Sequence, residues 1–300
     1  MDWRRALAPL GVPTVIIADD PALLATACDA YPEWRTEGPQ AEPVLELRLK
    51  LGDDPGDEAA EAIAVEGSRL TLTGAGIFGH ADAVSKRAHC VVPRRLLGDA
   101  STMAESVTDT LLLFLLARTG RTPMHAAGVM VGDTALVLAG PSGTGKSTLA
   151  LAAAERGLRI LSDDTLYIQL QPATRIWGFQ RPLHVFPQDA PRFTGGTRLR
   201  GGKLKAVVPL PQGSAGPPLA DKAVLILLER GERLGLTPLH PEAAMTGLER
   251  LEPGFDLLRE ESVAAARALA GGGGWRFTLA QDPGAAIDFL CEALGFGEQG

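Results

Sequence analysis

The stretch GPSGTGKST, residues 140–148, contains the side chains whose types and spacing are best suited to chemistry. It satisfies the pattern GxxxxGK[ST], in which glycines let the backbone wrap an anion and loop amides point at phosphate groups. In that arrangement Lys146 reaches the β- and γ-phosphates of a nucleotide, and the Ser147 hydroxyl coordinates Mg²⁺. The stretch therefore predicts a site for ATP and Mg²⁺ formed by Gly140, Ser142, Gly143, Thr144, Gly145, Lys146, Ser147 and Thr148.

The elements on either side of this loop bring a pair of carboxylates to it. The run ALVLA at 135–139 predicts a buried strand, and residues 146–157 predict a helix. The chain then returns as LRILS, a strand expected to run parallel to the first. Parallel strands end at the same edge of a sheet, so Asp163 and Asp164 arrive beside the loop. Because adjacent side chains alternate in direction, one carboxylate can face the metal and nucleotide and the other an incoming substrate; the alternative is a turn-forming pair.

A histidine reaches the same place through the register of a hairpin. The runs HAAGVMV and TALVLAG flank Gly132 and Asp133, a pair suited to a two-residue turn. Counting outward from that turn sets His125 opposite Gly140, at the mouth of the loop. The position predicts that the imidazole orients a carboxylate or contacts phosphate. The alternative is a structural histidine at the start of a strand.

Taken together, these residues resemble the catalytic domain of the HPr kinase/phosphorylase family, whose nucleotide core is similar to that of phosphoenolpyruvate carboxykinase. In that family a histidine stands 21 residues before the loop lysine and an aspartate 18 residues after it, which are the positions of His125 and Asp164. The resemblance implies that Asp164 accepts the proton of a serine hydroxyl, that Ser147 is a ligand of Mg²⁺, and that Lys146 and His125 are active-site residues. We count Asp163 with them, as a catalytic residue and a metal ligand.

The chain departs from this family after the carboxylate pair. The family's signature, a glutamate that binds Mg²⁺ within an E-I-R-G-L-G-type run, is replaced by WGFQRPLHVFP at residues 177–187. Arg181 and His184 are predicted to contact phosphate or substrate there, and Asp189 lies near the expected Mg²⁺ position; the alternative is that all three are surface loop residues. The resemblance is therefore not taken to imply that HPr is the phosphate acceptor of this chain or that the chain catalyses the reverse reaction, phosphorolysis. The chain is expected to be a stand-alone, divergent member of the family.

A basic segment follows, FTGGTRLRGGKLKAVVPLPQGSAGPPLA at residues 193–220. Its glycine and proline content predicts a mobile loop followed by a linker. Mobile cationic loops close over phosphate during phosphoryl transfer, whereas a solvated linker would do nothing. The cations concerned are Arg198, Arg200, Lys203 and Lys205, and the two lysines are predicted contacts of substrate or phosphate.

The composition excludes several classes of partner. The chain has 300 residues, a formal net charge of −7 and 45% hydrophobic residues, with no dense run of Lys and Arg of the kind that nucleic-acid binding needs. The longest uninterrupted apolar run, residues 111–117, is too short to cross a bilayer. Three cysteines lie far apart without CxxC spacing, which fits neither a disulfide framework nor a zinc site. We expect a cytoplasmic protein with no nucleic-acid or membrane partner, and the resemblance to a hexameric family implies self-association.

The pattern of elements predicts an α/β fold in two parts. Short alternating runs predict a β-rich α+β N-terminal region at 1–105, which we associate with substrate recognition. A P-loop catalytic domain of the HPr kinase type with a mixed sheet is expected at 106–300. A helix predicted at 101–120 is expected to bury its apolar half against that second domain.

Four functions remain open at this point. The first is an ATP- and Mg²⁺-dependent kinase that acts on a serine hydroxyl of a protein or peptide, and the second is a kinase of a small hydroxyl-bearing metabolite. The third is an NTP-hydrolysing switch ATPase, in which the strand AVLILL carries the metal site and Glu229 activates water. The last is a nucleotide-binding protein without transfer activity, which the set Lys146, Ser147 and Asp164 disfavours.

Overall fold

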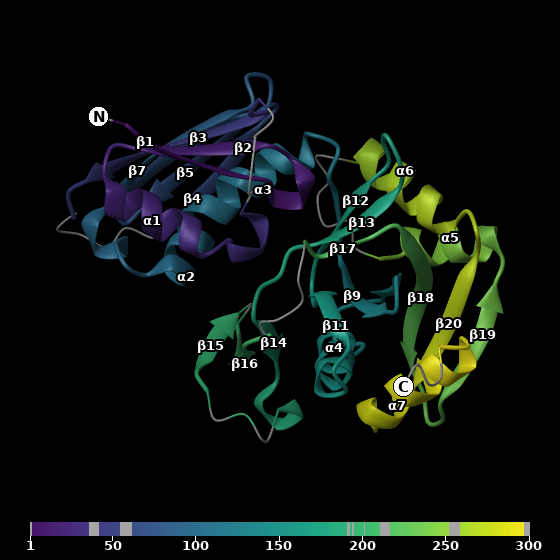
Figure 1. The fold of residues 1–300 in the computed structure, drawn as a ribbon. Coiled ribbons are helices and arrows are strands. Elements are labelled where there is room, and N and C mark those ends of the chain that lie inside the picture. The colour runs from purple at the N-terminus through teal and green to yellow at the C-terminus, as the bar shows by residue number, and fades with distance from the viewer. Residues whose placement is uncertain are drawn as a thin grey trace. The chain divides into compact units, whose positions relative to one another are not determined.

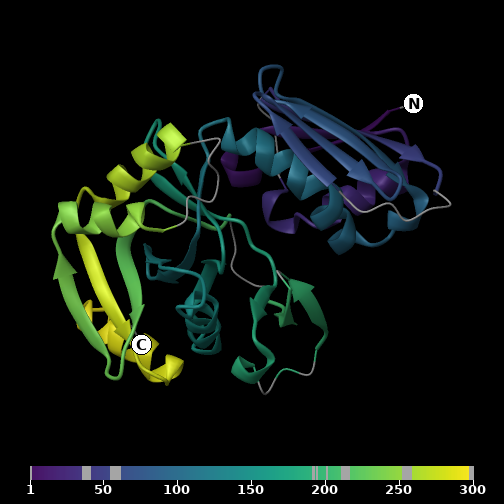
Figure 2. The ribbon, with the colours of Figure 1, turned by 180° about the vertical axis from the view of Figure 1, so that it is seen from behind.

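The computed structural model describes residues 2–35, 42–54, 62–190, 193, 195–200, 202–210, 217–251 and 259–296. The chain divides into two compact units, Met1–Arg121 and Thr122–Gly300. Each unit has its own sheet, with helices packed against it (Figures 1 and 2).

The N-terminal unit is built on one seven-stranded sheet in the order β1-β2-β3-β7-β6-β5-β4. β3 runs parallel to its neighbours β2 and β7, and the other neighbouring strands are antiparallel. The strands are β1 Trp3–Leu7, β2 Thr14–Ala18, β3 Leu45–Gly52, β4 Ala62–Glu66, β5 Arg69–Gly74, β6 Ile77–Asp82 and β7 Arg87–Pro93. Short helical turns lie at η1 Pro9–Gly11, η2 Pro32–Trp34 and η3 Arg94–Leu96.

Charges of alternating sign cross one face of this sheet. The register places Glu46, Arg87, Asp82, Arg69 and Glu66 side by side on five neighbouring strands. Arg69 and Asp82 form an ion pair with 3.1 Å between Nε and Oδ2. Opposite charges directly across a pair of strands stabilise it, and such a row marks a solvated face. On β3, β7, β6 and β5 the residue next to each of these charges is buried, which explains the period-two pattern of those four strands, whereas β4 has no buried residue.

The helices of this unit are α1 Pro21–Asp29, α2 Ala100–Met103 and α3 Asp109–Ala117, with a π-helical turn η4 Ala104–Thr108 between the last two. The continuous helical run Ala100–Ala117 is long and apolar enough to span a membrane by length and composition alone, and 56% of it is buried. α3 packs on β3, β6 and β7, as a core helix does. The helix predicted to pack on the second domain thus has its strand contacts within the N-terminal unit, and the boundary falls at Arg121 rather than at residue 105.

The main sheet of the C-terminal unit has six strands in the order β11-β9-β10-β18-β20-β19. They are β9 Ala126–Val131, β10 Thr134–Ala139, β11 Arg159–Ser162, β18 Lys222–Arg230, β19 Gly235–Leu239 and β20 Gly274–Leu279. β11 has the direction predicted for it, parallel to β10, but β9 lies between the two and pairs antiparallel with both. On its other side β10 pairs in parallel with β18.

Helices cover both faces of this sheet. α4 Lys146–Glu155 and α7 Pro283–Ala293 pack together on one face, and α5 Pro241–Glu249 and α6 Arg259–Ala270 pack on the other (Figures 1 and 2). Leu136 and Leu138 of β10 belong to the hydrophobic core on the side of α4 and α7. Ala135, Val137 and Ala139 belong to the core on the side of α5 and α6. A strand buried on both faces needs an uninterrupted apolar run, and TALVLA supplies one.

Two smaller sheets complete the C-terminal unit. A four-stranded sheet in the order β17-β13-β12-β8 contains an antiparallel hairpin of β12 Leu166–Gln169 and β13 Arg175–Gly178, with β8 Thr122–Met124 and β17 Leu219–Ala220 at its edges. A three-stranded sheet in the order β14-β16-β15 consists of β14 Leu183–Val185, β15 Thr197–Arg200 and β16 Lys203–Val208, and a helical turn η5 Pro187–Asp189 follows β14. The prediction of a mobile loop is thus wrong for residues 197–208, which form an antiparallel hairpin. The following linker, residues 211–216, lies outside the described residues.

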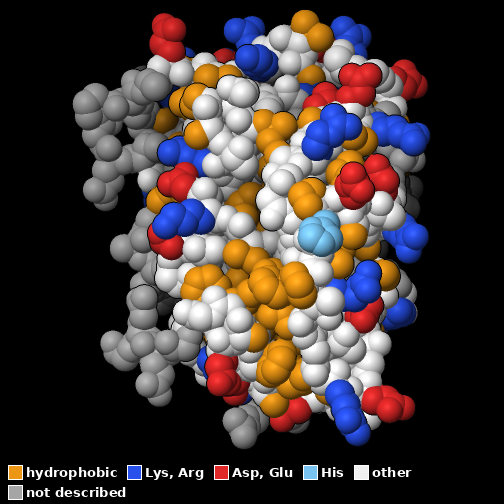
Figure 3. Space-filling model, turned by 90° about the vertical axis from the view of Figure 1, so that its right-hand side faces the viewer, with side chains coloured by type: hydrophobic (Ala, Val, Ile, Leu, Met, Phe, Trp, Pro, Cys, Tyr) orange, Lys and Arg blue, Asp and Glu red, His pale blue; other side chains and the backbone are white. Residues whose placement is uncertain are grey.

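The edge of the main sheet is protected by its sequence. β19 pairs only with β20 among the strands of this sheet, and it carries Pro238 in its middle. Proline has no N–H to offer, so it limits pairing with a further strand. Figure 3, which faces the side where β19 lies in Figure 1, shows a central band of hydrophobic side chains with charges of both signs around it.

Candidate functional site

The glycine-rich loop joins the end of β10 to the start of α4 and needs its glycines. Gly145 has a φ of 107° and Gly143 a φ of 85°, conformations that L residues rarely adopt. A Cβ on Gly145 would lie 2.8 Å from Nη2 of Arg230, and one on Gly140 would lie 2.9 Å from Oγ1 of Thr144. A Cβ at either position would meet a neighbouring side chain, so the loop backbone passes close to its surroundings at both ends.

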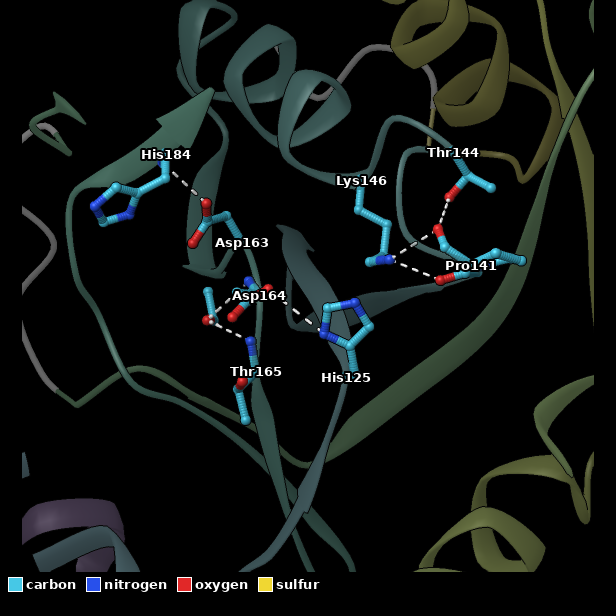
Figure 4. A network of polar contacts seen from close by, with 10 residues as sticks. His125, Pro141, Thr144, Lys146, Asp163, Asp164, Thr165 and His184 are labelled. Carbon is cyan, nitrogen blue, oxygen red and sulfur yellow. Dashed lines mark hydrogen bonds and ion pairs between the residues drawn. The ribbon is translucent and has the colours of Figure 1, made fainter. Parts of the chain in front are cut away.

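Lys146 is held inside this loop at the first residue of α4. Its side chain is buried, and Nζ donates to the carbonyl oxygens of Gly140 at 2.6 Å and Pro141 at 3.2 Å (Figure 4). Burial lowers the pKa of Lys146 below its ordinary value, and the charge of Asp164 opposes part of that shift. The ammonium group is therefore partly removed from water, and in this environment its attraction for an anion is stronger than in water.

The hairpin register puts His125 where it is predicted. Val131 pairs with Thr134 and Ala139 with Ala126, so His125 precedes β9 by one residue at the level of the loop. Its Nδ1 lies 3.4 Å from Oδ1 of Asp164, and about a third to a half of each side chain is exposed, 35% and 45% (Figure 4). The structure thus brings together an imidazole and a carboxylate that lie 39 residues apart in sequence.

Asp163 differs from its neighbour in burial and direction. It is only 6% exposed, and its Oδ2 accepts the backbone N–H of His184 at 3.1 Å. The chain turn after β11 is held by the Ser162 hydroxyl, which accepts the backbone N–H groups of Asp164 at 3.4 Å and Thr165 at 3.3 Å. Figure 4 shows the Asp163 carboxylate on the side of His184 and that of Asp164 on the side of His125. The two carboxylates therefore face different surroundings.

A cavity of about 390 Å³ collects most of the predicted residues. Its lining from the predicted set consists of His125, Ser142, Gly143, Gly145, Lys146, Ser147, Thr148, Asp163, Asp164, His184, Asp189, Lys203 and Lys205. Gly140 and Thr144 shape the loop without lining the cavity, and the Thr144 hydroxyl donates to the Pro141 carbonyl at 2.8 Å. Residues from five separate stretches of sequence thus meet at one end of the main sheet.

Arg181 does not belong to this cavity, contrary to the prediction. Its Nη1 donates to the carbonyl of Gln180 at 3.0 Å, and its guanidinium lies 4.4 Å from the centroid of the Phe179 ring. β13 ends at Gly178 and β14 begins at Leu183, so Arg181 lies in the connection between these strands.

Asp189 is tied to the start of α4. Thr148 donates from Oγ1 to Oδ2 of Asp189 at 3.0 Å, which fixes the turn η5 beside the loop. This contact holds the carboxylate at the cavity, and its role toward the metal stays a prediction.

Lys203 and Lys205 lie on β16 rather than in a mobile loop. Nζ of Lys205 is 3.3 Å from the centroid of the Phe186 ring, and Nζ of Lys203 is 6.0 Å from it. Phe186 itself lines the cavity, so the ring holds both cations at the cavity wall. Arg198 lies on the neighbouring strand β15, and nothing is described of the Arg200 side chain.

Arg230 is the charged cavity residue that the predicted set lacks. It ends β18, which runs parallel to β10, so both strands finish at the edge where the loop begins. The same rule that places Asp164 there applies to any residue at the end of a parallel neighbour. The sequence signal, a basic residue closing the strand KAVLILLER, is therefore present in the chain.

A second cavity of about 480 Å³ adjoins the first around the start of α4. The two share Gly145, Thr148, Asp189 and Arg230. Leu149 and Leu279 supply apolar surface to the second cavity, and Gln188 and Gln281 supply carboxamides; this combination suits the sugar and base of a nucleotide whose phosphates lie at the loop.

The donors at the loop fit Mg²⁺ better than a transition metal. Within the described ranges no three His, Cys, Asp or Glu side chains are grouped to hold a metal. Mg²⁺ uses one or two carboxylates together with phosphate oxygens and waters. The Ser147 hydroxyl and the Asp163 carboxylate are oxygen donors of this kind in the same cavity, and Asp189 is a third.

Comparison with known proteins leaves the family of the chain open. No family model and no curated protein matches it. Among solved structures, the chain is similar to the Hpr(Ser) kinase/phosphatase from Coxiella burnetii, with 12% sequence identity and a TM-score of 0.30, over 60% of this chain and 100% of that one. A likeness of this degree assigns no activity, so the functional argument must come from the site itself.

Proposed function

We propose that this protein is an ATP- and Mg²⁺-dependent kinase that transfers the γ-phosphate to a serine hydroxyl of a protein or peptide. The observation that carries the proposal is the pair His125 and Asp164, 3.4 Å apart, in one cavity with Lys146 of the glycine-rich loop. A phosphate loop alone is common to many nucleotide-binding proteins. A carboxylate oriented by an imidazole beside that loop is what an acceptor hydroxyl needs.

Asp164 and His125 have different roles in the transfer of the phosphoryl group. Asp164 accepts a hydrogen bond from the acceptor hydroxyl and receives its proton as the new P–O bond forms and the bond to the leaving β-phosphate oxygen breaks. His125 holds the Asp164 carboxylate in position. The transition state is loose, so orientation of the hydroxyl matters more than the basicity of the carboxylate.

The cations act at the phosphates. Lys146 and Arg230 neutralise charge on the transferring group and the leaving diphosphate. Ser147 and Asp163 would hold Mg²⁺, with Asp189 next to them through Thr148. When bound, the metal supplies further neutralisation of phosphate charge. ATP is a cytoplasmic metabolite, and we place the protein in that compartment.

The switch ATPase is disfavoured by the surroundings of Glu229. Its Oε1 accepts the Thr278 hydroxyl at 2.9 Å, and its Oε2 lies 3.7 Å from Nε of Arg276. Both partners belong to β20, and Glu229 does not line the loop cavity. A water-activating role has no support from this placement. A metabolite kinase keeps the same chemistry and differs only in the acceptor.

The test is incubation with γ-labelled ATP, Mg²⁺ and cell lysate or neighbouring-gene products, comparing the wild type with Asp164→Asn and Lys146→Ala. Label on a serine-containing polypeptide that disappears in both variants supports the proposal, whereas label on a metabolite selects the alternative acceptor. Release of phosphate to water with no labelled acceptor, at a rate that Asp164→Asn leaves unchanged, overturns the kinase assignment.

A further inference from the structure

The β15–β16 hairpin brings charges of the same sign together. Residues 195–208 contain four basic residues and no acidic one, in a chain whose net charge is −7. The register pairs Arg198 directly with Lys205. Directly paired residues share a face, and like charges there repel each other. In the N-terminal sheet, by contrast, the charged residues that pair across strands alternate in sign from strand to strand.

The lysines of this hairpin face the cavity that holds the catalytic pair. Lys203 and Lys205 are two residues apart on β16, so they point to the same side, and both line the cavity. The Phe186 ring lies under the Lys205 ammonium at 3.3 Å and holds it at the wall. Both ammonium groups therefore add positive charge to the cavity, where they would attract an anion.

These cations reach the cavity from a different sheet than the phosphate loop, since Lys203 and Lys205 lie on β16 of the three-stranded sheet and the loop follows β10 of the main sheet. β16 pairs with β14, where His184 faces Val207 in the register. Figure 4 shows Asp163 and Asp164 between His184 on one side and Lys146 on the other. Lys146 and Arg230 already supply positive charge on the nucleotide side. Lys203 and Lys205 are therefore additional cations in the same cavity, beyond those that the phosphates of the nucleotide engage.

We propose that the acceptor is an acidic peptide segment, with Asp or Glu close to the serine that receives phosphate. This inference rests on the kinase function proposed above and names its substrate class. Same-face residues of an extended peptide repeat about every 7 Å, which is also the spacing of Lys203 and Lys205 along β16. Two carboxylates two residues apart in an extended segment would meet both cations.

The experiment uses synthetic peptides that share one serine and differ only in the flanking residues. One series carries Glu within three residues of the serine, a second carries Gln and a third carries Lys. Label transfer from γ-labelled ATP is measured for the full chain, for Lys203→Gln, for Lys205→Gln and for Lys222→Gln. Lys222 is a matched control, since it is an exposed lysine paired with Asp133 outside the cavity.

We expect kcat/KM to be highest for the Glu series. Each cavity variant should lower the preference for Glu over Gln by about two- to fivefold, the range of a partly exposed charge pair, and raised salt should do the same. Lys222→Gln should leave the preference unchanged. Binding of an ATP analogue to every variant checks that the nucleotide site is intact.

Three results would overturn the inference. Equal labelling of the Glu and Gln series by the wild type means that the acceptor site does not select acidic residues, although the kinase function stands. A uniform loss for all peptides in the lysine variants assigns the lysines to the transferring phosphate instead. Absence of label on any serine peptide, with ATP-analogue binding intact, removes the proposed function itself.

Discussion

Nδ1 of His125 and Oδ1 of Asp164 lie 3.4 Å apart, although one residue precedes β9 and the other follows β11. β9 and β11 are antiparallel neighbours, so the start of the first strand lies beside the end of the second. β10, on the other side of β9, delivers the glycine-rich loop to the same edge. Three neighbouring strands therefore fix the geometry of the pair and the loop together.

The first prediction concerns Asp164→Asn. The amide keeps the shape of the side chain and cannot accept a proton, so phosphate transfer should fall by about 10²- to 10⁴-fold. Affinity for an ATP analogue should change little, because Lys146 and the loop remain. Single-turnover transfer and equilibrium binding measure the two effects separately. Asp133→Asn, an exposed aspartate at the hairpin turn, is the control; equal losses in both variants would contradict a catalytic role for Asp164.

The second prediction separates two reasons why a position requires glycine, namely its backbone conformation and a close neighbouring atom. Gly145→Ala meets Nη2 of Arg230 at 2.8 Å and also has a φ of 107°, whereas Gly157→Ala has a φ of 78° and open space around it. Both variants should lose about 1–2 kcal/mol of unfolding free energy through backbone strain. Only Gly145→Ala should also lose affinity for ATP, as measured by titration with a fluorescent analogue.

The same contact provides a further check on Gly145. Combining Gly145→Ala with Arg230→Ala removes the steric conflict and leaves the backbone strain. The double variant should therefore recover part of the stability that Gly145→Ala loses, as followed by denaturant unfolding. Additive losses in the double variant would show that the Arg230 contact is not what limits this position.

The third prediction distinguishes a kinase from a switch ATPase. Glu229→Gln should leave ATP turnover and transfer within about twofold of the wild type, because its carboxylate bonds to Thr278 and lies near Arg276, outside the cavity. Turnover measured by phosphate release and transfer measured by label give the two rates. A loss of 100-fold or more, on the order of that seen when a catalytic acid or base is removed, would restore the ATPase reading.

The parts of the site that the sequence predicts depend on local rules. The loop pattern, the turn at Gly132 and Asp133 and the alternation of side chains are enough to bring His125 and Asp164 to the loop, and the structure has that register. Asp189 also lies in the cavity, through its contact with Thr148. Each of these positions follows from short-range geometry or from the direction of a strand.

The parts that sequence reasoning misses depend on competition between signals or on packing. In RLRGGKLK the glycines and cations suggest a loop, whereas alternation around a Gly-Gly turn indicates a hairpin, and the hairpin forms. Gly202, with a φ of 73°, supports that turn. The apolar half of α3 fits either unit equally well by pattern, and only packing on β3, β6 and β7 decides between them.

The last prediction concerns pH. Burial lowers the pKa of Lys146 from its model-peptide range near 10.5, and the charge on Asp164 limits the shift. Nucleotide affinity needs the ammonium form, so it should fall as pH rises toward that lowered pKa, earlier than for an exposed lysine. Between the folded pKa and 10.5 the unfolded chain binds more protons than the folded one, so this group makes the unfolding free energy rise over the same interval.

Two variants test the assignment of this pH dependence to Lys146. Lys146→Arg keeps its charge to high pH, so its residual affinity for an ATP analogue should be flat between pH 7 and 10, where its pKa above about 12 leaves it protonated. Asp164→Asn removes the charge that favours the ammonium, so its affinity should begin to fall at a lower pH than that of the wild type. Equilibrium titrations across this range measure all three proteins. An unchanged midpoint in Asp164→Asn would mean that the carboxylate does not act on the lysine, because the loss of a neighbouring negative charge must lower a lysine pKa to which it contributes.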